Sequence, residues 1–112
     1  MEQIPQYRVV YADGAIRDIE EKADYIVTRF RDPELAERWY LSLRASIQKH
    51  LTTFPHKFQP YNVEPWNQRG IRQYITRNDV VLYSVDDEAK IVYIQVVCTK
   101  GRDLAVHLEE QE

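Results

Sequence analysis

The chain has 112 residues, of which 44% are hydrophobic and 29% are charged, and its formal net charge is −3. These values are ordinary for a soluble globular protein, and the length predicts one domain over residues 1–112 with one core. The sequence contains no apolar run long enough to span a bilayer and no signal peptide, and its single cysteine, Cys98, excludes an internal disulfide. We therefore expect a cytoplasmic protein.

The charge is unevenly distributed along the chain. The segment Arg38–Arg77 contains seven basic residues and only one acidic residue, Glu64, while both flanking segments are acidic. A basic segment of this kind can bind an acidic partner or nucleic acid. The alternative is that its arginines and lysines are scattered over the surface and simply solvated, and the sequence leaves both interpretations open.

A short strand and two helices are predicted in the first half of the chain. Tyr7–Tyr11 (YRVVY) forms the strand, and Asp13 is expected to cap a helix. Apolar residues recur in that helix at spacings of three and four: Ile16, Ile19, Ala23, Ile26 and Phe30. Asp32 as a cap and Pro33 at the first helical position begin a second helix, which Pro55 ends. Its apolar stripe comprises Ala36, Tyr40, Leu43, Ile47, Leu51 and Phe54.

The second half predicts a loop and then three antiparallel strands. The loop Pro55–Gly70 contains aromatic residues that we expect to pin it to the core, although aromatics interleaved with cations can also stack on nucleic acid. From Ile71 to Cys98, three runs rich in Val, Ile and Tyr are separated by Asn78-Asp79 and by Asp86–Lys90. By strict alternation, one face of the last run carries Val92, Ile94, Val96 and Cys98.

Together these elements predict an α+β fold. We expect an antiparallel sheet of about four strands, in the order strand–helix–helix–strand–strand–strand, with the two helices packed as a hairpin on one face. The turn Thr99–Asp103 is followed by a last helical turn or a frayed end. The residues expected to be buried together are Ile19, Ile26, Leu43, Ile47, Leu51, Leu82, Ile94 and Val96.

The order of these elements resembles the RelE/ParE superfamily of toxins from bacterial type II toxin–antitoxin modules. The matching pieces are YRVVY, AIRDIEEKADYI, LTTFP, IRQY, VVLYSVDDE, IVYIQVV and KGRDL. The resemblance implies a compact toxin that a cognate antitoxin neutralises by wrapping an extended segment around it, in a hetero-oligomer of the two proteins.

The superfamily has two biochemical branches. The resemblance to the RelE branch implies an endoribonuclease that cuts mRNA on the ribosome and places an arginine on the strand that reads DVVLYSV here. That position is Val80, so the catalytic set is incomplete, although Lys100 and Arg102 remain and His107 is a candidate general acid or a surface histidine. The resemblance to the ParE branch implies a toxin that inhibits DNA gyrase without catalytic residues of its own.

The residues favour the ParE branch and leave the other readings open. Arg72, Tyr83, Arg102 and Asp103 match its common pattern, and Arg72 and Tyr74 share a face of their strand, where a solvent-facing arginine and aromatic would make a binding surface. The alternative is that Tyr74, Tyr83 and Tyr93 are half-buried strand tyrosines, which we expect for at least two of the three. The alternatives are a ribosome-dependent endoribonuclease and a degenerate member that only binds its antitoxin. The candidate residues for target binding or toxicity are Arg72, Tyr74, Tyr83, Lys100, Arg102 and His107.

Other chemistries find little support in the sequence. The three histidines, His50, His56 and His107, have no metal-ligand spacing with one another or with Cys98, so we expect no metal site. With only three glycines, the chain has no glycine-rich phosphate loop, and we expect no cofactor.

Overall fold

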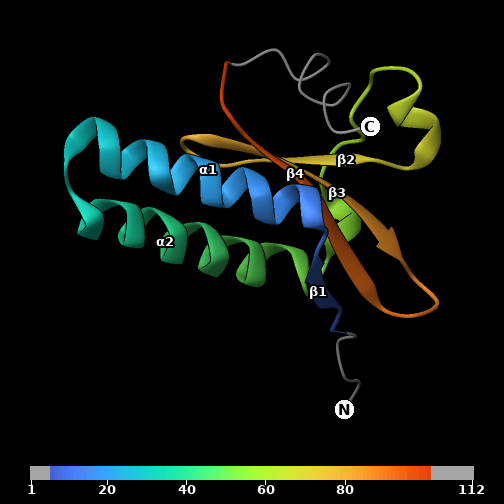
Figure 1. Cartoon of the computed structure of the whole chain (residues 1–112). Coiled ribbons are helices and arrows are strands. Elements are labelled where there is room, and N and C mark those ends of the chain that lie inside the picture. The colour runs from blue at the N-terminus through green and yellow to red at the C-terminus, as the bar shows by residue number, and fades with distance from the viewer. Residues whose placement is uncertain (1–5, 102–112) are drawn as a thin grey trace.

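The computed structural model describes residues 6–101, which form two layers (Figure 1). The elements follow the predicted order, and a helix hairpin covers one face of a four-stranded sheet. The strands are β1 (Arg8–Tyr11), β2 (Arg72–Ile75), β3 (Asp79–Asp86) and β4 (Ile91–Thr99). The helices are α1 (Asp13–Phe30) and α2 (Pro33–Leu51), with short 3₁₀ turns η1 (Pro55–Lys57) and η2 (Trp66–Arg69). The α+β class is therefore confirmed.

The sheet is mixed, whereas the sequence predicted a purely antiparallel one. Its order is β1-β4-β3-β2, and β1 runs parallel to β4 with Tyr11 opposite Ile94. The β2–β3 and β3–β4 pairs are antiparallel, as the short connections between them require. Alternation along β1 identifies a strand but carries no information about its neighbour, which is set by the helix crossover that separates β1 from the rest of the sheet.

A β-bulge in β4 breaks the predicted alternation. Leu82 lies opposite Val96 while the next residue, Tyr83, lies opposite Ile94, so Gln95 is the extra residue on β4. Beyond the bulge the side chains change faces: Ile94 packs in the cluster beneath the helices, whereas Val96 packs on the opposite face. The prediction that the whole of β4 keeps one alternation is wrong for this reason.

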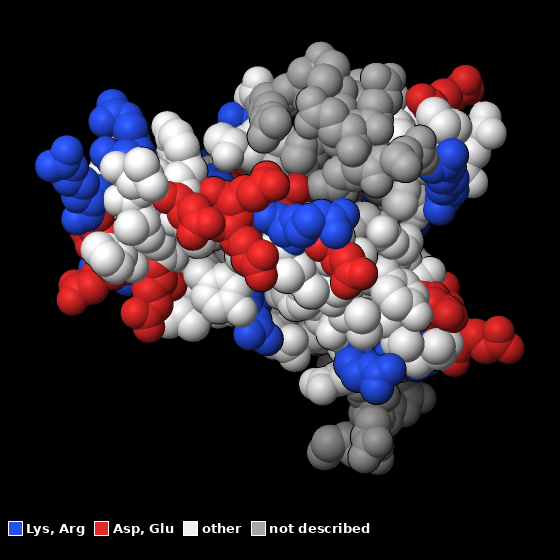
Figure 2. Space-filling view, in the orientation of Figure 1, with Lys and Arg blue, Asp and Glu red and all other residues white. Residues whose placement is uncertain are grey.

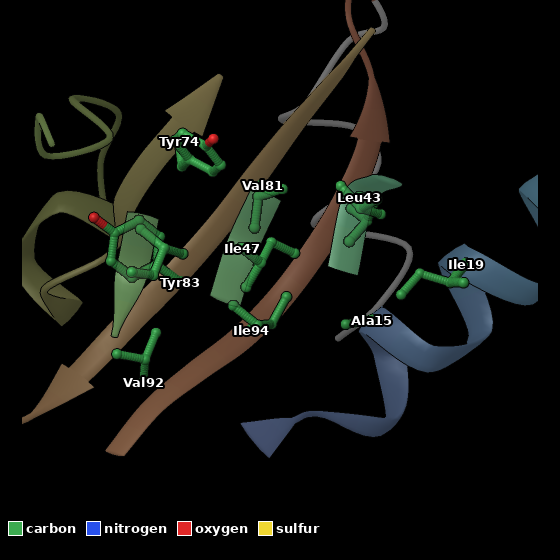
Figure 3. Close-up of a cluster of buried hydrophobic side chains, with 11 residues drawn as sticks. Ala15, Ile19, Leu43, Ile47, Tyr74, Val81, Tyr83, Val92 and Ile94 are labelled. Carbon is green, nitrogen blue, oxygen red and sulfur yellow. The ribbon is translucent and has the colours of Figure 1, made fainter. Parts of the chain in front are cut away.

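Buried apolar side chains of residues 6–101 form two clusters, one on each face of the sheet. The cluster beneath the helices, shown in Figure 3, includes Ile19, Leu43, Ile47, Leu51 and Ile94. The second cluster contains Tyr61, Val80, Leu82, Val96 and Cys98, with Trp66 and Ile71 packed against it. All eight residues predicted to be buried are buried, but Leu82 and Val96 lie across the sheet from the others, so the prediction of a single shared cluster is wrong.

Local interactions explain where the helices begin and end. Asp32 caps α2 as predicted, since its carboxylate accepts from the Leu35 amide at 3.1 Å. The predicted cap at Asp13 is wrong: Ala12 is the N-cap without a side-chain bond, and Asp13 lies in the first turn, where its charge favours the helix dipole. Helix α2 ends at Leu51, so Phe54 lies outside it.

Aromatic side chains fasten the loop after α2 to the core, as predicted. The Phe58 ring lies 4.8 Å from the Tyr74 ring, Tyr61 is buried, and Trp66 packs against the second cluster.

None of the described helices combines the length and apolar character that a membrane crossing needs.

Truncation of Ile94, which is completely buried, should destabilise the fold strongly. We expect Ile94→Ala to lower the free energy of unfolding by about 2–5 kcal/mol because it leaves a cavity beneath the helices. Leu41→Ala is the control, since Leu41 is 54% exposed, and it should change stability by less than about 0.5 kcal/mol. Urea denaturation measures both, and equal effects of the two substitutions would contradict the assignment of this core.

Candidate interaction surface

A buried carboxylate joins both helices to the sheet. Asp79, at the start of β3, is only 2% exposed. Its Oδ1 forms an ion pair with Lys22 Nζ of α1, and its Oδ2 accepts a hydrogen bond from Trp39 Nε1 of α2 at 2.9 Å. The Lys22 ammonium also lies 5.1 Å from the centre of the Trp39 ring, a cation–π distance. One side chain therefore fixes the position of α1, α2 and β3 relative to one another.

The same aspartate orders the turn between β2 and β3. Its backbone amide donates to Thr76 Oγ1 at 2.9 Å, and its carbonyl accepts from the Thr76 amide at 2.9 Å. The Lys100 amide in turn donates to the Asn78 carbonyl at 2.9 Å, which holds the end of β4 against this turn. The turn is thus a rigid support for the exposed Arg77 and Lys100 side chains.

Two adjoining hollows lie around this network. A hollow of about 670 Å³ separates α2 from the end of β2, and one of about 580 Å³ lies between the ends of both helices and the turn. They share Leu35, Trp39, Arg77 and Asn78, and we call the combined surface the basic cradle. It presents the exposed cations Arg38, Arg77 and Lys100.

The cationic side chains of the basic cradle are exposed and are not paired with acidic side chains of residues 6–101. In the described part of the chain, Arg38, Arg77 and Lys100 form no ion pair. Among residues 6–101, Asp79 is the only acidic residue that lines the cradle, and it is already paired with Lys22. Large apolar side chains are exposed on its rim: Tyr25 (61%), Phe30 (56%) and Ile75 (53%). The arrangement can therefore bind a ligand that is both acidic and apolar.

Two of the residues predicted from the sequence, Arg72 and Tyr83, lie opposite each other in the β2–β3 register and hold the loop after α2. Arg72 Nη1 donates to the Phe58 carbonyl at 2.6 Å and to the His56 carbonyl at 3.1 Å. Tyr83 is fully buried and its hydroxyl donates to the Pro55 carbonyl at 2.6 Å. Burial raises the pKa of Tyr83 to about 12.

Tyr74 also lies in the interior, which agrees with the alternative of buried strand tyrosines and excludes a solvent-facing aromatic here. It is 7% exposed, and its hydroxyl is hydrogen-bonded to Ser46 Oγ of α2. Its face of β2 is the one that the helices cover, and parity alone could not distinguish that face from an open one. The structure thus brings Arg72, Tyr74 and Tyr83 together around the loop and places Lys100 in the basic cradle; Arg102 and His107 lie outside the described residues.

Val80 and His56, which the sequence analysis considered for catalysis and for metal binding, have ordinary structural surroundings. Val80 is 7% exposed within the second cluster. His56 Nε2 lies 2.7 Å from Asp87 Oδ1, which also accepts from Tyr7 OH at 2.7 Å. The hydrogen bond with His56, and to a smaller extent the one from Tyr7, holds the pKa of the Asp87 carboxyl below its usual value. No group of three or more potential metal ligands occurs among residues 6–101.

Sequence reasoning missed the network of Lys22, Trp39 and Asp79. Asp79 was interpreted only as a turn residue, and Trp39 was not used at all. A signal was present, because a tryptophan next to an apolar helix stripe requires a hydrogen-bond acceptor for its N–H. The sequence did not identify which of its many carboxylates supplies that acceptor.

Removal of the tryptophan donor should weaken this network. We expect Trp39→Phe to lower the free energy of unfolding by about 1.5–3 kcal/mol, since the buried Asp79 carboxylate loses a charge-assisted hydrogen bond. Tyr25→Phe, at a residue 61% exposed, is the matched control and should be close to neutral. Thermal or urea unfolding of both variants checks the expectation, which fails if Trp39→Phe is as stable as the control.

The raised pKa of Tyr83 predicts a loss of stability in alkali. Its folded pKa of about 12 exceeds the ordinary value of 10.0, so between these pH values the folded state keeps a proton that the unfolded state releases. The stabilisation is complete below pH 10 and falls as the pH rises toward 12. Urea midpoints measured across this range should decline more steeply for the wild type than for Tyr83→Phe, and parallel declines would contradict the assignment.

Comparisons with known proteins agree with this architecture. The family model described as ParE toxin of type II toxin-antitoxin system, parDE, matches residues 4–104. A solved structure of the chromosomal ParDE toxin–antitoxin system from P. aeruginosa superposes with a TM-score of 0.67 at 17% identity, covering 84% of this chain and 96% of that one.

A second solved structure, the RelBE2 toxin–antitoxin complex from Mycobacterium tuberculosis, has a TM-score of 0.58 at 20% identity and covers 85% of this chain and 99% of that one. At these identities the likeness to the two structures concerns the fold. A search of curated proteins found no match. The family model covers nearly the whole chain, and the protein belongs to the family of ParE toxins of type II toxin–antitoxin systems.

Proposed function

We propose that this chain is the toxin of a type II toxin–antitoxin pair, that it acts by binding a cellular protein, and that this target is DNA gyrase. The observation that carries the proposal is the match of the ParE toxin family model to residues 4–104. The proposal includes an antitoxin partner that neutralises the chain, because the similar solved structures are of a ParDE system and a RelBE2 complex.

The position of Val80 supports binding over RNA cleavage. Attack of a ribose 2′-hydroxyl develops negative charge on the phosphate, and loss of one positioned cation typically costs on the order of 100-fold to 1,000-fold in rate. Val80, which the resemblance aligns with the arginine of the RelE branch, packs with Leu82 and Val96 in an apolar cluster. Arg72, on the neighbouring strand, already donates to two loop carbonyls. Neither position offers a free cation to a phosphate.

Acidic and basic side chains lie on different parts of the surface, and this distribution supports a partner that is an acidic protein. Figure 2 shows acidic side chains gathered over α1, where Asp13, Glu20, Glu21 and Asp24 are exposed. The basic cradle is lined by Arg38, Arg77 and Lys100. An acidic partner is repelled by the outer face of α1 and attracted to the cradle, which orients it during encounter. Lys100 is therefore a candidate for target or antitoxin binding, and Arg72 is a candidate for holding the adjoining loop in place.

Two activity assays run together test the proposal. The purified chain should inhibit supercoiling by gyrase and should leave mRNA intact on programmed ribosomes. Lys100→Glu should reduce inhibition by about tenfold or more if the cradle contacts the target, whereas Lys49→Glu, an exposed charge on α2 outside the cradle, should act like the wild type.

Robust mRNA cleavage would overturn the proposed mechanism. If cleavage collapses in Arg72→Ala while the variant stays folded, Arg72 is the phosphate-binding residue of a ribonuclease, and the chain acts by the RelE-like chemistry. Circular dichroism of the variant is needed beside the assay, because the substitution removes both hydrogen bonds to the loop. Absence of both activities would leave a family member that only binds its antitoxin.

A further inference from the structure

We propose that the open edge of β1 pairs with β1 of a second copy of this chain, antiparallel and about a two-fold axis at Val10. The two sheets then join into one continuous sheet. The pair forms at the edge of the sheet that lies opposite β2 and the basic cradle, so it goes beyond the proposed function and does not depend on it (Figure 1). It is carried by unpaired backbone groups on β1, by the length of the open edge and by the charges at its ends.

The hydrogen bonds of β1 show that Val9 and Tyr11 direct their backbone polar groups away from the sheet. The amides of Arg8 and Ala12 donate inward, at 2.8 Å and 2.9 Å, to carbonyls of the segment that contains β4. Because backbone direction alternates along a strand, Val9 and Tyr11 present N–H and C=O outward. No hydrogen bond from residues 6–101 reaches these outward groups.

The opposite edge of the sheet is partly covered by the chain itself. On β2, Pro60 forms a bridge with Arg72, and the Gln73 amide donates outward to the Gln59 carbonyl at 2.9 Å. Within residues 6–101, no loop pairs with β1 in this way. The sequence of β1, RVVY, contains no proline and a single charged residue, Arg8. An uncovered edge of this kind can pair with another strand.

The open edge is short and is bounded at both ends. At one end the Tyr7 amide donates to the Thr52 carbonyl at 2.7 Å, which places the end of α2 against the edge. At the other end Ala12 is still extended, with φ −66° and ψ 155°, and α1 begins at Asp13. The open stretch is therefore Arg8–Ala12. A second copy supplies a strand of the same length, which ends where the available edge ends.

A single antiparallel register pairs the outward groups of both residues in both copies. It places Val9 opposite Tyr11 of the second copy and Tyr11 opposite Val9, with Val10 facing Val10 at the axis. A register centred on Val9 would place Tyr11 opposite Tyr7, whose amide is already bonded to the end of α2. A register centred on Tyr11 would place Val9 opposite Asp13, which is helical. The chain's own boundaries thus select the register centred on Val10.

The same register brings opposite charges together. Arg8 lies opposite Ala12 of the second copy, one residue before Asp13, so its long side chain reaches the first turn of the second copy's α1. Both Arg8 and Asp13 are exposed, and neither forms an ion pair within residues 6–101. The two-fold axis generates this contact twice, so the charges are complementary at both ends of the paired strands.

A matched pair of substitutions at Val9 tests the pairing. Proline at residue 9 removes an outward N–H without touching the bonds between β1 and β4, and proline is tolerated on edge strands for this reason. In sedimentation velocity, the wild type should change from monomer to dimer as its concentration rises. Val9→Thr, which keeps the N–H and favours a strand, should do the same, and Val9→Pro should remain monomeric. Urea midpoints verify that both variants are folded.

A cysteine at the two-fold axis tests the register independently. Two residues that face each other in a non-hydrogen-bonded antiparallel pair have Cα atoms about 4.5 Å apart, which is within the range of a disulfide. The thiol oxidant diamide should therefore cross-link Val10→Cys into a dimer. Arg8→Cys should not be cross-linked, because its counterpart lies about 13 Å away along the paired strands. The wild type, in which the buried Cys98 is the single cysteine, is the background control.

A charge reversal tests the contact at the ends of the strands. Arg8→Glu should weaken dimerisation by about tenfold or more, because it places two like charges together. Adding Asp13→Arg to this variant should restore dimerisation, since the double substitution recreates the ion pair with its signs exchanged. Failure of the second substitution to restore the dimer would remove Arg8 and Asp13 from the interface and contradict the register.

The outcomes are separate from those of the activity assays. A wild type that stays monomeric at every concentration, a dimer that forms equally in Val9→Pro and Val9→Thr, or equal cross-linking of Val10→Cys and Arg8→Cys would each overturn the proposal. A monomeric chain that instead selects unrelated strand peptides from a displayed library, and loses them in Val9→Pro, would assign the edge to a different protein and overturn it as well. None of these measurements involves gyrase, mRNA or an antitoxin.

Discussion

The shared hydrogen bonding of Asp79 is the interaction on which the shape of the candidate surface depends. A carboxylate that is 2% exposed is costly to bury unless cationic or N–H groups replace its lost hydration. Here Lys22 and Trp39 supply these groups from two different helices, and Thr76 closes the turn on the other side. The geometry of the network thus fixes how far the helix ends lie from the turn. The side chains of the network form the floor of the basic cradle.

A second buried carboxylate acts in the same way at the bulge in β4. Asp18 of α1 is 6% exposed, and its Oδ2 accepts from the Val97 amide at 3.0 Å, two residues beyond Gln95. The bulge reverses the faces of the following residues, so β4 contributes to both clusters. A sheet with apolar residues on both faces needs cover on both, and the loop with Tyr61 and Trp66 supplies it on the side opposite the helices.

The features that follow from local patterns could be predicted from the sequence. The start of α2 at Asp32 and Pro33, the three-strand meander and the pinned loop all follow from neighbouring residues. The parallel placement of β1 and the extra residue Gln95 depend on contacts between distant segments. The alternation of apolar and polar residues within one strand carries no information about such contacts. The same limit explains the site: Tyr74 and Arg72 share a face of β2, but only the position of α2 determines that this face is interior.

The distribution of charge shows how tertiary contacts change the meaning of a sequence count. Several cations in the basic segment Arg38–Arg77 are engaged by aromatic rings or carbonyls: Arg44 with Tyr11 and Tyr40, Lys57 with Phe58, Arg69 with Trp66, and Arg72 with the loop.

These contacts make the segment less uniform as a binding surface than its charge suggests. Arg38 and Arg77 remain exposed at one hollow, and Lys100 joins them from β4, outside the basic segment of the sequence. The Asn78 carbonyl holds the Lys100 amide beside the turn, so Lys100 lines one hollow together with Arg77, and Arg77 lines the other together with Arg38. A binding surface of this kind is produced by the fold, and the excess of basic residues in one sequence segment locates it only in part.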